Sequence, residues 1–437
     1  AGCLVFWMNA GFACVEAGFC RSKNIVHVLA MNYLIIAVTT VSFWAIGFGI
    51  MFGDGNAFMG LSGFFPSLLD KTSFTVLGSS GVAISALFFF QMVFADTAGT
   101  ILSGVIAERM KLSAYILFAF IMGAVLYPTT GHWIWGGGWL GQMGFHDFAG
   151  STVVHSIGGW VGLTGALLVG ARLGKYNAQG KPRAIKAHNM SLVAIGGFIL
   201  WLGWFGFNPG STLAADPKAI GHIFLTTNFA GAAGTFTAIF AAWLKTRKVD
   251  FGVAINGTLA GLVAITAPCD GVSMIGALAI GAAAGVFSYY ATFFFDYLRI
   301  DDPVGALSVH LVNGIWGTLA FGLFATKAGS VGTVDGLLYG GGSAQLMTQL
   351  IGVAAVGGFM VVASTLAWLL VKAVVGLRVT AAAELGGLDL HDHDMSGYEL
   401  DEPIVDTDAG SIDVPSIFQP AYARCEKFAE ETAEAQR

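Results

Sequence analysis

The chain has very little charge. Only 11% of its residues are Asp, Glu, Lys or Arg, whereas 55% are hydrophobic and the mean hydropathy is +0.72. Soluble domains carry roughly 25% charged residues, so the composition argues against a soluble protein. It predicts a polytopic membrane protein.

Cysteine and strand patterns are also scarce. The five cysteines show no metal-binding spacing, and their odd number argues against a disulfide framework. Segments of strand length in which polar and apolar residues alternate are absent, so we expect helices and no β-barrel. Glycine is abundant, with 61 residues, as in helices that pack closely in lipid. Because the chain begins at Ala1 in an apolar stretch without methionine, we also expect a preceding segment.

Apolar runs of about 20 residues predict membrane spans. We expect eleven, at residues 1–20, 25–53, 81–107, 112–133, 149–171, 189–209, 223–244, 252–269, 273–295, 304–326 and 345–371. With the N-terminus outside, the loops expected inside hold 15 basic residues and those expected outside hold three. The positive-inside rule therefore predicts an outside N-terminus and an inside C-terminus.

Acidic residues are concentrated at the C-terminus. Of the 27 Asp and Glu residues, 14 follow Arg378. We therefore predict two domains, a transmembrane domain at 1–375 and an acidic cytoplasmic tail at 376–437, whose partner is a protein and not anionic lipid or nucleic acid. A solvated, partly disordered tail is the alternative. His391 and His393 are spaced like metal ligands, but a solvated tail is the better explanation.

The spans divide into two units of five on either side of the basic loop at 172–188, with the eleventh span left over. Units with an odd number of spans lie inverted to one another, as in inverted-repeat transporters. His155 follows Asp147 by eight residues, and His310 follows Asp302 by eight. Eight residues of helix rise about 12 Å, and half the hydrocarbon core is about 15 Å. The two histidines are thus expected to meet near the middle of the membrane.

Two neutral imidazoles in contact can share one N–H···N hydrogen bond and fix each other's tautomer. Such a pair suits an uncharged polar solute or a relayed proton and does not suit a metal cation. Packing histidines are one alternative. Haem ligation in a membrane oxidoreductase is another, although neither span has a second histidine. We expect no metal and no cofactor.

Three aromatic groups accompany the histidines. They are Phe90 and Phe94; Trp133, Trp135 and Trp139; and Trp201, Trp204, Phe205 and Phe207. An interfacial aromatic belt explains many of them. The functional alternative is a cation–π site for a small cation that sheds water, assisted by a hydroxyl group such as that of Ser211.

Other polar residues in or beside the spans have structural explanations. Asp147 starts a span and can cap it, and Asp301 and Asp302 precede Pro303 in the same manner. Hydrogen bonds between helices are the expected role of a further set inside the spans. This set consists of Glu16, Asn32, Asp96, Asn208 and Asn313.

Six ordered segments resemble the ammonium transporter family (Amt/Mep/Rh). They are GFACVEAGFCRSKN, ERMKLSAYILFAF, WGGG, DFAGSTVVHSIGGWVGLTGALLVGAR, WLGWFGFNPGS and DDPVGALSVHLVNGIWGT. The resemblance extends from the first span to about residue 400. Trp135, the Phe90/Phe94 pair and the WFGF run resemble the Amt branch, and GLRVTAAAELGGLDLHDHDMSGYEL resembles the Amt cytoplasmic tail.

The resemblance implies roles for individual residues. His155 and His310 correspond to twin pore histidines, Phe94 and Phe207 to a stacked gate with Phe90 beside it, Phe94, Trp135 and Ser211 to an outer ammonium site, and Asp147 and Trp204 to structural support.

The resemblance also implies a function. We expect a homotrimeric plasma-membrane transporter of ammonium and methylammonium, not an enzyme, whose tail meets a PII-type signal protein. A Rhesus-like neutral channel for ammonia or carbon dioxide is one alternative. An ammonium sensor that signals through the cytoplasmic tail is the other.

Overall fold

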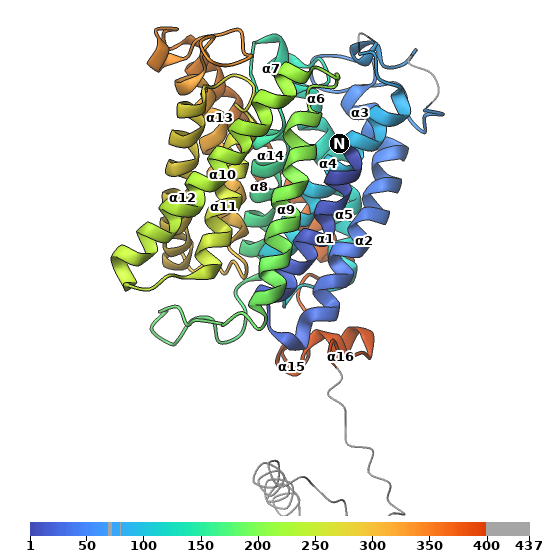
Figure 1. Ribbon diagram of the computed structural model, residues 1–437. Helices are drawn as coiled ribbons and strands as arrows, with labels where there is room; N and C mark the ends of the chain where they lie inside the picture. The colour runs from blue at the N-terminus through green and yellow to red at the C-terminus, as the bar shows by residue number, and fades with distance from the viewer. Residues whose placement is uncertain (69–71, 79, 399–437) are drawn as a thin grey trace, which may run out of the picture. The chain divides into compact units, whose positions relative to one another are not determined.

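Helices joined by loops make up the computed structural model, which describes residues 1–68, 72–78 and 80–398 (Figure 1). Within these residues no strand is formed, and four isolated bridges are the only β pairings. The helical elements are α1 (Gly2–Phe19), η1 (Ser22–Asn24), α2 (Ile25–Ser42), η2 (Phe43–Gly47), α3 (Phe48–Phe52), η3 (Thr75–Leu77), α4 (Ile84–Ile106), α5 (Leu112–Ile121), η4 (Met122–Leu126), α6 (Tyr127–Ile134), α7 (Trp139–Gln142), η5 (Ser151–Ser156), α8 (Ile157–Val169), α9 (Met190–Gly210), α10 (Pro217–Thr246), α11 (Phe251–Thr266), α12 (Met274–Tyr297), η6 (Leu307–Leu311), α13 (Val312–Phe324), η7 (Leu337–Tyr339), α14 (Ala344–Val375), α15 (Ala381–Gly386) and α16 (Leu388–His393).

Each of the eleven apolar runs forms a helical segment, which confirms an all-helical polytopic membrane protein. In the part of the chain that the structure describes, ten segments are long and apolar enough to cross a membrane. The remaining segment, α11, corresponds to the expected span at 252–269. It has 16 residues, or about 24 Å of helix, whereas the hydrocarbon core is about 30 Å thick. The count of eleven spans and their orientation therefore stay predictions.

Glycine allows the closest helix contacts. A Cβ atom on Gly196 of α9 would lie 2.5 Å from the carbonyl oxygen of Gly11 in α1. Likewise, a Cβ on Gly234 of α10 would lie 2.3 Å from the carbonyl oxygen of Gly257 in α11. Both separations are shorter than van der Waals contact, so a larger residue would push these helices apart. The high glycine content thus allows the close packing expected of helices in lipid.

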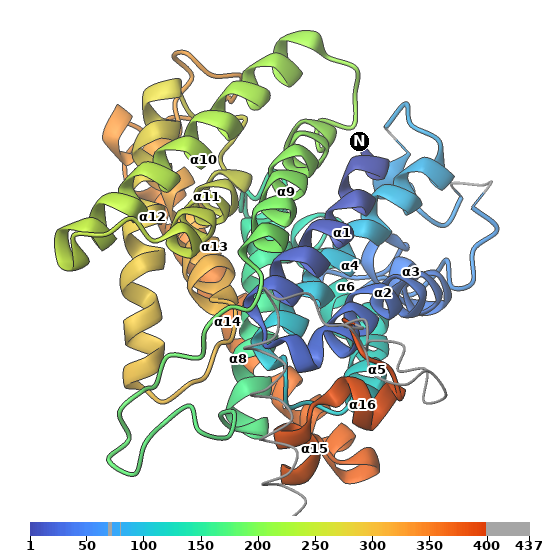
Figure 2. The ribbon, with the colours of Figure 1, turned by 60° about the horizontal axis from the view of Figure 1, so that its bottom comes forward.

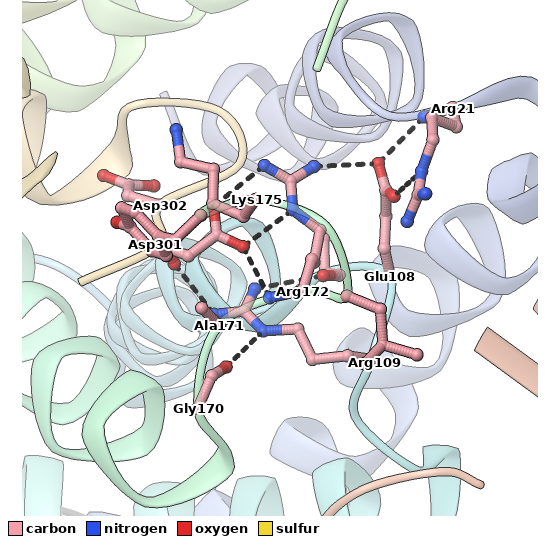
Figure 3. A network of polar contacts seen from close by, with 12 residues as sticks. Arg21, Glu108, Arg109, Gly170, Ala171, Arg172, Lys175, Asp301 and Asp302 are labelled. Atoms are coloured by element: carbon pink, nitrogen blue, oxygen red, sulfur yellow. Dashed lines mark hydrogen bonds and ion pairs between the residues drawn. The ribbon is translucent and has the colours of Figure 1, made fainter. Parts of the chain in front are cut away.

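A buried charge network joins the loops at one end of the helices (Figure 3). The guanidinium group of Arg172, which follows α8, binds both carboxylate oxygens of Asp301 at 2.8 and 2.9 Å. It also binds Glu108, at 3.1 Å, and Glu108 binds Arg21 in turn. The Arg109 guanidinium donates to the Asp301 carbonyl at 2.8 Å. Segments far apart in the sequence are therefore held together by charge-assisted hydrogen bonds.

The pKa of Asp301 reflects this network. Burial raises it, but the hydrogen bonds and the charge of Arg172 outweigh burial and hold the pKa well below its usual range. Asp301 is therefore a carboxylate, and the pair with Arg172 is charged on both sides.

The C-terminal helices pack against the same end of the helices, as Figure 2 shows for α15 and α16. Lys23 donates to the carbonyl oxygen of Glu384 at 2.8 Å, and the Asp389 carboxylate accepts the backbone N–H of His27 at 2.9 Å. The ring of His393 lies 3.3 Å from the ring of His27, nitrogen to nitrogen. A solvated tail does not describe this part of the chain, because these bonds fasten it to η1 and α2.

Ala1–Gly397 form one compact unit, so residues 376–397 of the predicted tail pack with the helices. The rest of that tail, 399–437, lies outside the described residues, and the domain boundary at 375 stays a prediction.

Removal of the Asp301 charge is expected to destabilise the fold. In Asp301→Asn, Arg172 loses its bidentate carboxylate partner but stays buried, with 4% of its side chain exposed. Breaking a buried ion pair typically costs about 3–5 kcal/mol, which thermal unfolding in detergent would measure. Asp335→Asn is the matched control, since its pair with Lys327 is exposed and 3.9 Å long. A similar change in both variants would contradict the importance of the buried network.

Candidate functional site

Asp147 organises the segment that carries His155. Its Oδ1 accepts the backbone N–H groups of Gly150 and Ser151, both at 2.9 Å. Its Oδ2 accepts two more, from Thr152 at 2.8 Å and Val153 at 2.9 Å. One carboxylate thus binds four of the N–H groups at the start of a helix that have no partner within it. Burial raises the pKa of Asp147, and these backbone hydrogen bonds oppose that rise.

Asp302 does the same for the segment that carries His310. Its carboxylate accepts the N–H groups of Gly305, Ala306 and Leu307 at 3.1, 3.0 and 2.7 Å. Both histidines lie in short π-helical turns, η5 and η6, and such turns are frequent at functional sites. The spacing of eight residues from aspartate to histidine is thus accompanied in both segments by the same local structure, a carboxylate cap followed by a π-helical turn.

The two histidine rings lie against each other. Their Nδ1 atoms are 3.2 Å apart, and the ring centroids are separated by 5.3 Å. Only one of the two nitrogens can donate in this bond, so a single proton sits between the rings. The Nε2 atom of His155 is buried without a hydrogen-bond partner among the described residues. A polar solute would satisfy it, as a donor or as an acceptor according to which ring carries the shared proton.

Aromatic rings continue the histidine pair into a column. Trp135 and Phe94 have centroids 6.1 Å apart, and Phe94 stacks on Phe207 at 3.9 Å with an interplanar angle of 15°. Phe207 lies 5.5 Å from His155. The stacked phenyl rings are in contact, so a solute can reach His155 along this column only if a ring rotates. Between Trp135 and His155 the column consists of Phe94 and Phe207, whose side chains are both buried.

Phe90 and Ser211 lie beside Phe94 and Phe207 of this column. Phe90 is 4.5 Å from Phe94, centroid to centroid, and a Cβ atom on Gly210 would lie 3.0 Å from its ring. The next residue, Ser211, donates its hydroxyl proton to the carbonyl oxygen of Phe207 at 2.9 Å. Its oxygen lone pairs therefore remain to accept a proton donor.

Two tryptophan N–H groups fix the surroundings of the column. Trp135 donates to the carbonyl oxygen of Asp147 at 2.7 Å. Trp204, which lies 5.3 Å from His155 ring to ring, donates to the hydroxyl of Thr266 at 2.9 Å. Both rings are thus held in one orientation.

On the other side of the histidines lies a small cavity. Its volume of 20 Å³ is sufficient for about one water molecule. His310, Phe12 and Glu16 are among its lining residues, and the Phe12 ring lies 5.8 Å from the His310 ring. Phe12 was not among the residues predicted to form the site. The signal that points to it is its position four residues before Glu16, on the same face of α1.

The polar residues inside the spans mostly form the expected bonds between helices. Asn9 of α1 donates to Asp96 of α4, and Asn208 of α9 donates to Thr227 of α10 at 3.0 Å. Asn313 differs, because it donates to the carbonyl oxygen of Ser308 five residues earlier.

Metal ligands do not gather around this column. Across residues 1–68, 72–78 and 80–398, no group of three or more His, Cys, Asp or Glu side chains is placed to hold a metal ion.

The helical fold and the ring column define a class of protein, a polytopic membrane protein with a column of buried aromatic rings that ends at a buried histidine pair. The model of the Ammonium Transporter Family matches residues 1–398. Ammonium transporter Amt2 of Archaeoglobus fulgidus is 43% identical over 419 residues, which cover 91% of this chain and 86% of that protein. The chain belongs to the ammonium transporter family.

Solved structures agree. A sensor Amt protein is similar with a TM-score of 0.82 and 39% identity, over 90% of this chain and 96% of that chain. Candida albicans Mep2 is similar with a TM-score of 0.80 and 27% identity, over 87% of this chain and 84% of that chain. The relatives are transporters and not enzymes.

Asp147→Asn is expected to destabilise the fold by about 2–4 kcal/mol, because an amide NH₂ group replaces one oxygen and leaves two buried N–H groups unbound. Thermal unfolding of the purified protein measures the loss. Asp216→Asn is the control, since Asp216 caps α10 through two N–H groups at an exposed position. Equal losses in both variants would contradict the assigned role of Asp147.

Proposed function

We propose that this protein transports ammonium by binding the cation at Trp135, removing its proton and passing ammonia along the ring column to His155 and His310. The observation that carries the proposal is the order of groups, in which a ring-lined mouth leads through stacked phenyl rings to a buried imidazole pair. A bare cation is costly in so apolar a passage, whereas neutral ammonia is not.

Selectivity follows from the groups at the mouth. The faces of Trp135 and Phe94 attract a small cation by about 0.5–2 kcal/mol, and the lone pairs of Ser211 accept an N–H donor. Potassium has a similar size but donates no hydrogen bond. Ammonium and methylammonium are therefore the substrates that we propose, with Phe90 and Phe207 completing the mouth and gate around Phe94.

The histidines supply the polar groups inside the passage. With Nδ1 of each ring in the shared bond, the Nε2 atoms are left for the solute. Neutral ammonia can donate to one and accept from the other, depending on which ring carries the shared proton. Asp147 and Trp204 hold the pair in position.

Placement and assembly are proposed on the same basis. The distribution of basic residues supports an orientation with the N-terminus outside, so that the Trp135 mouth faces outward, and we propose the plasma membrane as the location. A homotrimer and a PII-type partner at the cytoplasmic tail are further proposals, and native mass spectrometry of the purified protein would test the trimer.

An ammonium sensor is the second candidate. The docking of α15 and α16 on the loops favours it, because Glu384 accepts the backbone N–H of Leu173 at 2.6 Å and binds Arg378 at 2.7 Å. Leu173 directly follows Arg172, which binds Asp301 beside the cap of the His310 segment. Charge movement during uptake distinguishes a transporter of ammonium from a Rhesus-like neutral channel.

Methylammonium uptake in a transport-deficient host tests the site. His155→Ala removes the polar group inside the passage and is expected to lower uptake at least about tenfold. Trp135→Ala removes the cation–π face and is expected to raise the half-saturating concentration about two- to thirtyfold, with Trp135→Phe between it and wild type.

The control is His391→Ala, whose ring is half exposed on α16. It is expected to leave uptake unchanged. Wild-type uptake in both His155→Ala and Trp135→Ala would contradict the site.

A further inference from the structure

We propose that Glu16 of α1 holds the proton that separates from ammonium, on the side of His310 away from the stacked phenyl rings. This inference rests on the proposed transport function. It assigns a route for the proton beside the route for ammonia, so that both cross the membrane and one net charge moves with each ammonium.

The position of Glu16 supports this role. Glu16 is 2% exposed, and it lines the water-sized cavity together with His310. The Nδ1 atom of His310 is occupied by His155, which leaves its Nε2 atom for this cavity. A single water molecule between the imidazole and the carboxyl group would complete a hydrogen-bonded path.

The neighbours of Glu16 do not compensate a negative charge. Its carboxylate accepts hydrogen bonds from Asn32, at 2.8 Å, and from the hydroxyl of Ser103, at 2.8 Å, and both groups are neutral. No ion pair of Glu16 is formed within the described part of the chain. A buried carboxylate without a cation is costly unless it takes up a proton, and ionisable groups in this position are frequent in proton relays.

Ser103 makes either protonation state of Glu16 acceptable. Its hydroxyl has one proton to donate and two lone pairs. Its oxygen lies 2.8 Å from both carboxylate oxygens and 2.6 Å from the carbonyl oxygen of Thr100. When Glu16 is charged, the hydroxyl donates to Glu16. When Glu16 holds a proton, it donates to Ser103, whose hydroxyl turns to the Thr100 carbonyl.

At the mouth, ammonium transfers one proton to a water molecule and becomes ammonia. Ammonia crosses along the rings. The proton enters the imidazole pair at the Nε2 atom of His155, whose Nδ1 proton passes to the Nδ1 atom of His310 through the shared bond. The Nε2 atom of His310 then releases a proton through the cavity water to the Glu16 carboxylate, which becomes a neutral carboxylic acid. Loss of that proton on the far side regenerates the carboxylate, and ammonium forms again there.

Asp96 provides a matched comparison. It is also a buried carboxyl group in a membrane span, with 0% exposure, and it is bonded to Asn9. It is not among the described residues that line the cavity. Glu16 and Asp96 are thus both buried carboxyl groups, and they differ in that Glu16 lines the cavity beside His310.

The experiment uses purified protein in lipid vesicles, given an ammonium gradient, with protein-free vesicles as the measure of leak. Two quantities are recorded, the current and the internal pH. If ammonia and its proton both enter, wild type gives a current and little rise in internal pH. Glu16→Gln is expected to lower the current at least about tenfold and to increase the rise in internal pH, because ammonia enters without its proton. Asp96→Asn is expected to behave like wild type.

A lower current together with a larger rise in internal pH identifies a group that holds a proton, whereas the loss of a structural group would lower both. A Glu16→Gln variant that keeps the wild-type current, or that loses current and ammonia entry together while it remains folded, overturns the proposal. If Glu16→Gln does not fold, Ser103→Ala is used, and the same opposite changes are expected. Ammonia entry without current in wild type overturns the role of Glu16 but retains transport, whereas neither signal in wild type overturns transport itself.

Discussion

The bonds between the Asp147 carboxylate and four backbone N–H groups are the interaction on which the site depends. A helix that begins inside the protein leaves N–H groups without partners, and lipid offers none. One carboxylate binds these groups and so fixes where η5 begins. That position sets the height of His155, and Asp302 sets the height of His310 in the same way. The histidine contact is thus determined by two caps that do not touch the histidines.

The buried charge network holds together the two segments that carry His155 and His310. Asp301 precedes Asp302 directly and binds Arg172, which ends the segment of His155. The start of one histidine segment is therefore fastened to the end of the other. Because both ions are buried, neither can leave the pair at low cost. This arrangement allows two histidines 155 residues apart in the sequence to meet at hydrogen-bonding distance.

Much of the fold could be predicted from the sequence, because lipid forces apolar runs into helices and because their length is set by the bilayer. The histidine contact was also predictable, since equal spacing from two aspartates implies equal depth. The place of Phe12 was not predicted, because its signal is a spacing of four residues from Glu16, and an apolar residue on an apolar helix does not otherwise stand out. The docking of α16 on His27 was missed for a different reason, because acidic composition indicates exposure but does not identify a partner.

Glu16 and Asp147 show how the same functional group takes different roles in one membrane protein. Asp147 accepts from backbone N–H groups, whose direction is fixed by the chain, so its bonds permit one arrangement only. Glu16 accepts from the Ser103 hydroxyl, which can turn toward the Thr100 carbonyl. A carboxyl group whose donors are fixed stays charged and supports structure, because a proton added to it would point at an N–H donor and find no acceptor. A carboxyl group whose donor can become an acceptor can take up and release a proton without leaving a polar atom unbound.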